Sequence, residues 1–317
     1  MMENLMFSLE ATIPVFLVIV LGYALRRIGM LNDEFIRIAN KFNFEVTLPV
    51  LLFRDIYTAD ITSVWDPVYV LYCALVTTVS FFLIWFLAKR FLKDQFMTGA
   101  FAQGAFRSSA AVLGIAFIQN MYGSSGMAPL MIVGAVPLYN IFAVVALTLG
   151  SREAGKESGM ERIRITCKNI LTNPIILGIV VGLVFSLLKI PVHSIFSKTI
   201  NSVASMATPL ALVTIGAAFE GRKALKKVVP TLWASGYKLV FQAAIFLPLA
   251  IWLGFRDEKL IAILIMLAAP TTPSCYIMAK NMHNDDVLTS SIIVTTTLLS
   301  AFTLTAWIYL LKSAGLL

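Results

Sequence analysis

The sequence predicts an all-α polytopic membrane protein with ten transmembrane helices in two inverted five-helix repeats, in which helices four and nine are broken and cross. Three observations lead to this prediction. The 317 residues are 59% apolar and only 13% charged, whereas soluble domains average about 25% charged residues. Apolar segments recur at about 20 residues, the length that carries a helix across roughly 30 Å of hydrocarbon. An internal repeat also runs through the chain at a constant offset.

The apolar runs set the ten expected spans, and short connections separate them. The spans are 7–27, 34–54, 67–90, 97–120, 126–149, 170–189, 195–219, 228–253, 259–280 and 285–311. The longest connection, from Gly150 to Lys168, is rich in Gly, Ser, Glu and Arg. We therefore expect a first repeat over 1–150, a cytoplasmic linker over 151–169 and a second repeat over 170–317.

Basic residues alternate along the connections. Those that follow spans one, three, five, seven and nine hold two, three, five, four and one Lys or Arg, fifteen in all, against six on the other side. The positive-inside rule then places the richer set in the cytoplasm and both termini outside the cell. We expect a multi-pass protein of the cell (inner) membrane. Because topology accounts for the net charge of +8, no nucleic-acid partner is expected.

Metal and nucleotide chemistry are not expected. The three cysteines and two histidines have no metal-ligand spacing, and the chain lacks a phosphate-binding glycine loop. No cofactor is therefore predicted.

The repeat appears as matched residues 160 positions apart, each pair at a similar depth in corresponding spans. The pairs are Pro14 with Pro174, Gly22 with Gly182, Pro49 with Pro209, and Phe142 with Phe302. Five spans is an odd number, so the second half must enter from the opposite face. Inverted repeats of this kind place a binding site between them near the bilayer midplane.

Prolines mark the expected helix breaks. Pro270 and Pro273 interrupt an apolar run long enough to be a span, and each lacks an N–H and clashes with the preceding turn. In hydrocarbon the freed carbonyl needs a partner, so such a break should line a cavity. The 160-residue offset places Arg107 and its serines beside this break. Pro49 and Pro209 are expected to break spans two and seven.

Arg107 is the leading candidate for binding. An arginine in the middle of a span costs about 2.5–3.5 kcal/mol on insertion scales and faces an interior partner or cavity. Its planar fork suits a carboxylate. The alternatives are a structural pair with Glu45 and a side chain that snorkels to the membrane interface. Further polar groups expected at the site are Ser108, Ser109, Thr271, Thr272, Ser274 and Asn43. For any single hydroxyl the competing interpretation is a bond back to its own helix.

Two residues are candidates for coupling to an ion gradient. Glu45 could titrate or bind a cation, and Gln103 lies in the same span as Arg107. Glu45 could equally lie near the membrane interface, so its role stays open.

Several motifs carry a resemblance to a known family. They are residues 40–53 (NKFNFEVTLPVLLF), Asn173 with Pro174, residues 209–212 (PLAL) with Gly216, residues 269–273 (APTTP) and residues 295–300 (TTTLLS). In their order and spacing, these motifs resemble the auxin efflux carrier family over nearly the whole chain, and its bacterial-type permeases in particular.

The resemblance implies ten helices in two inverted halves, crossing fourth and ninth helices, and an elevator-like element that moves beside a scaffold. It also implies export or exchange of organic anions. The family commonly has an asparagine and often a proline at the first crossing. Here residues 106–111 read FRSSAA, which argues against an auxin-like substrate, whereas Arg107 keeps a carboxylate plausible.

We therefore expect a secondary transporter, not an enzyme, that moves small mono- or dicarboxylates across the lipid bilayer by alternating access. The main alternative is a Na⁺- or H⁺-coupled symporter resembling the bile-acid/sodium family. A membrane-embedded enzyme and a passive channel are further alternatives. The anion, the coupling ion, the direction of transport and the oligomeric state, including a homodimer, stay open.

Overall fold

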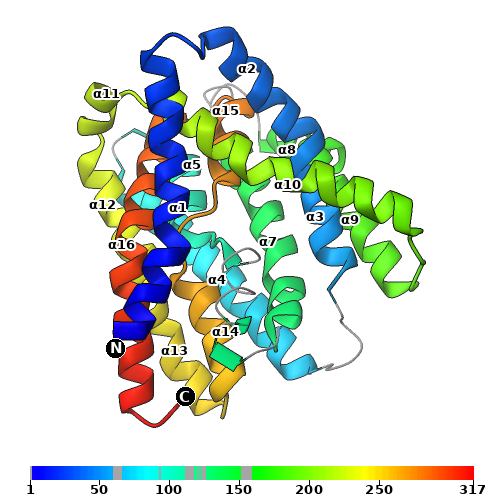
Figure 1. The fold of residues 1–317 in the computed structure, drawn as a ribbon, viewed down its shortest axis with the longest axis vertical. Helices are drawn as coiled ribbons and strands as arrows, with labels where there is room; N and C mark the ends of the chain where they lie inside the picture. Colours follow the sequence, from blue (N-terminus) through cyan, green and yellow to red (C-terminus); the bar gives the residue numbers. More distant parts are fainter. Residues whose placement is uncertain are drawn as a thin grey trace.

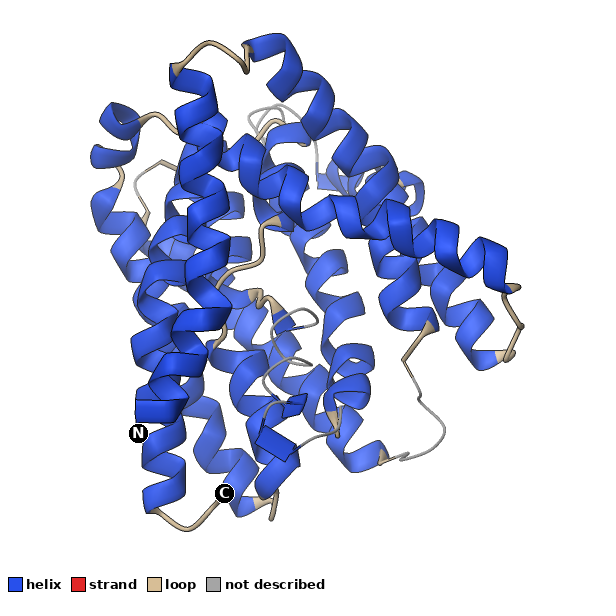
Figure 2. Cartoon of the chain, viewed as in Figure 1, coloured by secondary structure: helices blue, strands red, loops and turns tan. Residues whose placement is uncertain are grey.

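The computed structural model describes residues 2–59, 66–92, 94–110, 118–119, 121–122, 126–150 and 159–317. Over these residues the chain forms helices and loops and no strand (Figure 2). In chain order the helices are α1 (Met2–Arg27), α2 (Asp33–Phe42), the π-helix η1 (Asn43–Thr47), α3 (Leu48–Tyr57), α4 (Pro67–Phe91), α5 (Met97–Phe106), α7 (Ala128–Leu149), α8 (Gly159–Thr172), α9 (Pro174–Leu187), α10 (Ser194–Ala217), α11 (Gly221–Leu225), α12 (Val228–Gly236), the π-helix η2 (Tyr237–Phe241), α13 (Gln242–Trp252), α14 (Asp257–Ala268), α15 (Ser274–Asn281) and α16 (Asp286–Ser313).

Five described helices are long and apolar enough to cross a membrane: α4, α7, α10, the continuous segment Val228–Trp252 and α16. A sixth candidate is the pair Arg164–Thr172 and Pro174–Leu187, which meets at a bend of 59°. These helices agree with five of the expected spans and, with the bent pair, a sixth. The full count of ten stays a prediction.

Side chains at the helix starts explain several boundaries. Asp66 accepts a hydrogen bond from the backbone N–H of Tyr69 at the start of α4, and Pro67 follows it. Asn173 caps α9 in the same way and is also followed by a proline. A capping oxygen satisfies an N–H that has no partner within the helix, and proline fits the first turn because it needs none.

Two of the four prolines expected to break helices do not. Pro209 lies inside α10, which continues from Ser194 to Ala217. Pro49 lies in the first turn of α3, and the chain stays helical from α2 through η1 into α3. In span two the disturbance takes the form of a π-helical segment, which absorbs an altered hydrogen-bond register without ending the helix.

Spans four and nine are interrupted where the sequence predicted. Helix α5 ends at Phe106, and Arg107 adopts an extended conformation. Helix α14 ends at Ala268, Ala269 is extended, and α15 begins at Ser274. Residues 111–117, with Gly114 among them, lie outside the described residues, so the further course of span four stays a prediction.

One group of helices comprises α1, α2, η1, α3, α9 and α10, which pack on one another. Among the described glycines, the tightest site lies between α1 and α10, where a Cβ on Gly216 would lie 1.9 Å from the carbonyl oxygen of Ile19. Asn43 of η1 donates a hydrogen bond to the Ala207 carbonyl of α10 over 2.9 Å. In both contacts, a residue of one helix lies against a backbone carbonyl of another. We call this set of helices the first group.

The second group comprises α4, α5, α7, the α12–η2–α13 segment, α14, α15 and α16. Phe81 of α4 stacks on Phe142 of α7 with ring centroids 4.5 Å apart, and Tyr72 of α4 donates to the Phe246 carbonyl of α13 over 2.7 Å. Helices α1 and α16 lie side by side where the two groups meet (Figure 1). Both chain ends lie toward the same end of the molecule in this view.

Candidate functional site

Arg107 lies at the interruption after α5 and is 2% exposed. Its Nη2 atom donates to Asn140 Oδ1 of α7 over 2.9 Å and to Ser274 Oγ of α15 over 3.0 Å. Its Nη1 atom lies 2.9 Å from the Met278 sulfur. The guanidinium thus joins α7 to the start of α15, beside the break in span nine.

The charge of Arg107 is incompletely compensated. None of the ion pairs among the described residues includes Arg107, and its Nε atom is buried without a hydrogen-bond partner. The pairing with Glu45 considered from the sequence is absent, because Glu45 lies 3.9 Å from Lys41 and is half exposed. A buried cation without an anion is costly, so an anionic ligand would stabilise it.

Ser108 and Ser109 hold the two breaks together. Ser108 Oγ donates to the carbonyls of Ile265 and Ala269 at 3.0 and 3.1 Å. The backbone N–H of Ser109 donates to the Pro270 carbonyl over 2.9 Å. These bonds join the first interruption to the last turn of α14 and to the residues that follow it. Both residues also line the cavity described below.

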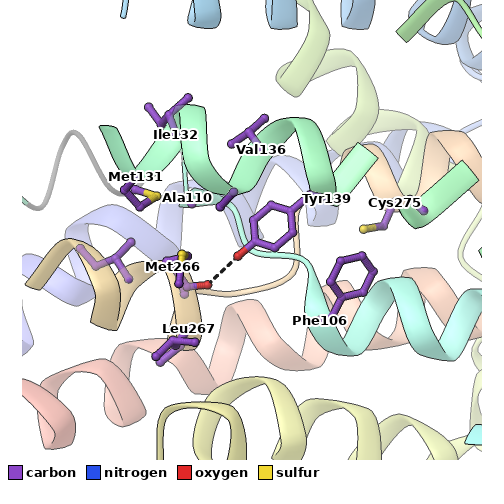
Figure 3. Packing of buried hydrophobic residues seen from close by; sticks show 14 of the residues in the cluster. Phe106, Ala110, Met131, Ile132, Val136, Tyr139, Met266, Leu267 and Cys275 are labelled. Carbon is purple, nitrogen blue, oxygen red and sulfur yellow. Dashed lines mark hydrogen bonds between the residues drawn. The ribbon is translucent and has the colours of Figure 1, made fainter. Parts of the chain in front are cut away.

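Tyr139 of α7 also bonds to the last turn of α14. Its hydroxyl donates to the Met266 carbonyl over 2.9 Å, drawn as the dashed line in Figure 3. Phe106 packs beside the Tyr139 ring, with centroids 5.6 Å apart. The end of α14 is therefore held by polar groups from the first interruption and from α7.

The hydroxyls of the second break divide into two roles. Thr271 is buried and makes its hydrogen bonds within the protein. Its Oγ1 atom donates to the Gly104 carbonyl over 2.7 Å, and its backbone N–H donates to Thr296 Oγ1 over 3.2 Å. Thr272 and Ser274 lie 3.2 Å apart, oxygen to oxygen, at the start of α15. Only Thr272 and Ser274 face the cavity.

A cavity of about 60 Å³ lies between the two helix groups. The second group contributes Arg107, Ser108, Ser109, Thr272, Pro273, Ser274 and residues of α7, and the first group contributes α3, Ile175 of α9, and Ala207, Thr208 and Ala211 of α10. Its volume suits a few water molecules. Five of the seven residues expected to bind substrate line this cavity.

Asn43 and Gln103 are buried in the packing between helices and do not line this cavity. Asn43 binds the Ala207 carbonyl and accepts from Thr47. Gln103 Nε2 donates to the Cys275 carbonyl over 2.9 Å, while its Oε1 atom is buried without a partner. In this conformation both join helices: Asn43 within the first group and Gln103 within the second.

A second, larger cavity of about 1510 Å³ lies where α1, α2 and α10 approach α15 and α16. Glu45 lines it, and it shares no lining residue with the smaller cavity. Seven of its lining side chains are basic and four are acidic: Arg26, Arg27, Arg37, Lys41, Arg222, Lys223 and Lys280 against Asp33, Glu45, Glu220 and Asp286. We call it the basic basin.

Two residues of the candidate site were missed from the sequence. Asn140 is a lone amide in the apolar span 126–149, and it holds Arg107. Asp55 lines the smaller cavity and pairs with Arg54 over 2.7 Å. A polar residue inside a span is itself a signal of function, and this signal could have singled out Asn140.

Comparison with known proteins indicates a membrane transporter. The family model described as membrane transport protein matches residues 7–308. A protein of Methanothermobacter thermautotrophicus, named an uncharacterized transporter, is 24% identical over 303 residues, which cover 95% of this chain and 98% of that protein. The family match confirms the resemblance to auxin efflux carriers.

Proposed function

Because the chain belongs to the membrane transport protein family of auxin efflux carriers, we propose that it is a secondary transporter of small organic anions, in particular mono- and dicarboxylates. The family and the relative both indicate a membrane-embedded transporter and not an enzyme. The chemistry of the site supports an anionic substrate.

The observation that carries the proposal is the unpaired charge of Arg107. Its guanidinium is buried, lacks a carboxylate partner among the described residues, and keeps a free Nε–H. It lines the same cavity as Ser274, the first residue of α15. Helix starts favour anions because their N–H groups and dipole point at the ligand. A substrate carboxylate would complete this arrangement.

Alternating access fits the position of the cavity. Its walls come from two helix groups, so a shift of the second group against the first would carry the site from one face of the membrane toward the other. Both interruptions belong to the second group and are joined by the Ser109–Pro270 hydrogen bond. They would move as one unit, which is the elevator-like motion we propose.

Contacts related by the repeat support two inverted halves of five spans. A Cβ on Gly22 of α1 would lie 2.2 Å from the carbonyl oxygen of Val213 in α10. A Cβ on Gly182 of α9 would lie 3.0 Å from the carbonyl oxygen of Phe53 in α3. Gly182 and Val213 are each 160 positions beyond Gly22 and Phe53, so one contact repeats the other with the roles of the halves exchanged.

In the proposed topology the basic basin opens to the cytoplasm and both termini lie outside the cell. Several of its side chains, including Arg26 and Lys223, belong to the connections that the positive-inside rule places inside. A basic mouth raises the local concentration of anions and speeds their arrival. The basin would therefore serve as the cytoplasmic approach of the anion.

A proton-coupled symporter is the second candidate, and Asp55 favours it. Its side chain is 12% exposed, and it lines the cavity that Arg107 also lines. A buried carboxylate at a substrate site can carry a proton with the substrate. Glu45 and Gln103, which the sequence suggested for coupling, do not line this cavity.

Uptake by proteoliposomes tests the proposed function. We expect saturable uptake of a labelled small carboxylate and exchange against unlabelled carboxylate inside. Arg107→Gln should raise the apparent KM about 10- to 100-fold, since hydrogen bonds to a charged group contribute about 1.5–3 kcal/mol. Arg90→Gln, at the exposed end of α4, is the matched control.

Two outcomes would contradict the proposal. Flux that rises linearly with concentration would indicate a channel. An unchanged KM in folded Arg107→Gln protein would remove Arg107 from the site.

A further inference from the structure

Lys238 is a buried cation that the proposed transport site does not use. It lies in the π-helix η2 and is 0% exposed. Its Nζ atom donates to the Leu267 carbonyl over 2.6 Å, to Gln242 Oε1 over 3.2 Å and to the Met266 carbonyl over 3.4 Å. An ammonium group has three N–H donors, and three acceptors surround it.

None of these acceptors carries a formal charge, and no ion pair among the described residues includes Lys238. Two of them, the carbonyls of Met266 and Leu267, are among the last four carbonyls of α14, which ends at Ala268. The end of a helix carries roughly half a negative charge, and its last carbonyls have no partner within the helix. The ammonium therefore compensates the partial negative charge at the end of a broken helix and not the charge of a side-chain carboxylate.

The surroundings hold the ammonium in place. The Leu239 carbonyl of η2 accepts from Trp307 Nε1 of α16 over 3.1 Å, and Tyr237 Oη lies 3.1 Å from Ser80 Oγ of α4. A π-helical turn leaves backbone groups out of the regular ladder, and α16 satisfies one of them. Lys238 is thus fixed from two neighbouring helices.

We propose that the Lys238 ammonium is the resident cation of the broken span nine, and that it takes the place of a bound monovalent metal ion at the end of α14. Its three acceptors form an all-oxygen set, which is the kind that hard cations bind. Lys238 acts as a positioning residue: it stabilises the end of α14, from which the chain continues into Thr272 and Ser274 of the cavity.

The proposal has two consequences. The first is structural and does not depend on transport: removal of the ammonium opens a site for a small external cation. The second rests on the proposed function: carboxylate transport by the unaltered protein needs no Na⁺.

Thermal unfolding in detergent tests the first consequence. Lys238→Ala should lower Tm. Adding NaCl should then raise the Tm of this variant by on the order of 2–4 °C for each kcal/mol of Na⁺ binding free energy, and the rise should saturate with NaCl concentration. Choline chloride at equal ionic strength should not do so. Lys238→Met also lacks the charge but fills the space, so Na⁺ should not raise its Tm. The exposed Lys198→Ala variant is a control for salt effects.

An identical response of Lys238→Ala to Na⁺ and choline would overturn the structural half of the proposal. Uptake by the unaltered protein tests the other half and does not need a variant that folds. Equal rates in Na⁺ and choline media are expected, and a Na⁺ requirement would overturn the resident-cation role. If no carboxylate is taken up in either medium, the proposed function fails while the Tm comparison still decides the role of Lys238.

Discussion

The backbone N–H of Ser109 donates to the carbonyl of Pro270 over 2.9 Å, so the two interrupted segments meet through main-chain atoms. The bond joins residues 161 positions apart, counted from 109 to 270. A second bond joins the same two segments, because Arg107 Nη2 donates to Ser274 Oγ over 3.0 Å.

Asn140 accepts a hydrogen bond from Arg107, so a change at this position should alter the charge available to a substrate. Asn140→Asp would place a carboxylate within 2.9 Å of Arg107 Nη2, where the amide oxygen now lies. We expect this internal ion pair to raise Tm but to weaken carboxylate binding at least about tenfold, because substrate must displace it. Thermal unfolding and KM for uptake measure the two effects.

Asn140→Ala should instead lower Tm, since it removes an acceptor from a buried charge. The exposed Asn201→Asp variant adds a carboxylate away from the site and serves as the control. An Asn140→Asp protein that transports with an unaltered KM would refute the role of Arg107 in anion binding.

The contact between α1 and α10 should not tolerate a larger residue. A Cβ on Gly216 would lie 1.9 Å from the Ile19 carbonyl oxygen, a backbone atom that cannot turn away. Gly216→Ala should cost about 1–3 kcal/mol or more by overpacking. Differential scanning fluorimetry should therefore show a lower Tm.

Gly236→Ala is the matched control for this change. The nearest atom to a Cβ at this site is 3.7 Å away, and alanine is favoured over glycine within a helix by about 0.5–1 kcal/mol. Its Tm should stay the same or rise. Equal Tm values for the two variants would argue against a tight α1–α10 contact.

Asp66 links the start of α4 to the first turn of α14, where Lys259 Nζ lies 2.6 Å from its carboxylate. The hydrogen bond from Lys259 lowers the pKa of Asp66 below its usual 3.8. A lowered folded-state pKa gives stability that is present above the unfolded value and is lost as pH falls through the folded one. This pair should therefore contribute at neutral pH and stop contributing in acid below about pH 4.

Asp66→Asn should lower the free energy of unfolding near pH 7 by no more than about 1 kcal/mol, because the pair is partly exposed. The amide keeps an oxygen to cap Tyr69. Unfolding curves of both proteins between pH 3 and 7 should converge toward the acid end. Lys259→Met should reproduce this loss, and a difference that grows in acid would contradict the predicted sign.

Replacing Asp55 and replacing Glu45 should have different effects on proton-coupled uptake. If protons are coupled, Asp55→Asn should abolish the pH dependence of uptake, because Asp55 lines the cavity. Glu45→Gln should change uptake by less than about twofold, since Glu45 is half exposed beside Lys41 and exposed pairs contribute little. Loss of pH dependence in Glu45→Gln alone would reassign the coupling to the basic basin.

The helical membrane class and the positions of both interruptions could be predicted from the amino-acid sequence. Apolar length and the missing N–H of Pro270 act locally, so a linear pattern carries them. The intramembrane charge of Arg107 also marked the site, since its cost demands a partner wherever the helices lie. The family motifs, read in order, indicated a transporter.

Which polar groups face the cavity depends on how the helices pack, and the sequence did not predict it. Thr271 and Thr272 are neighbours, yet one bonds to Gly104 and the other lines the cavity. Pro209 stays within a continuous helix, and Lys238 reaches the carbonyl of Leu267, 29 positions away. The rotation of each helix about its axis and its long-range neighbours set these outcomes, and neither is encoded in a local pattern of residues.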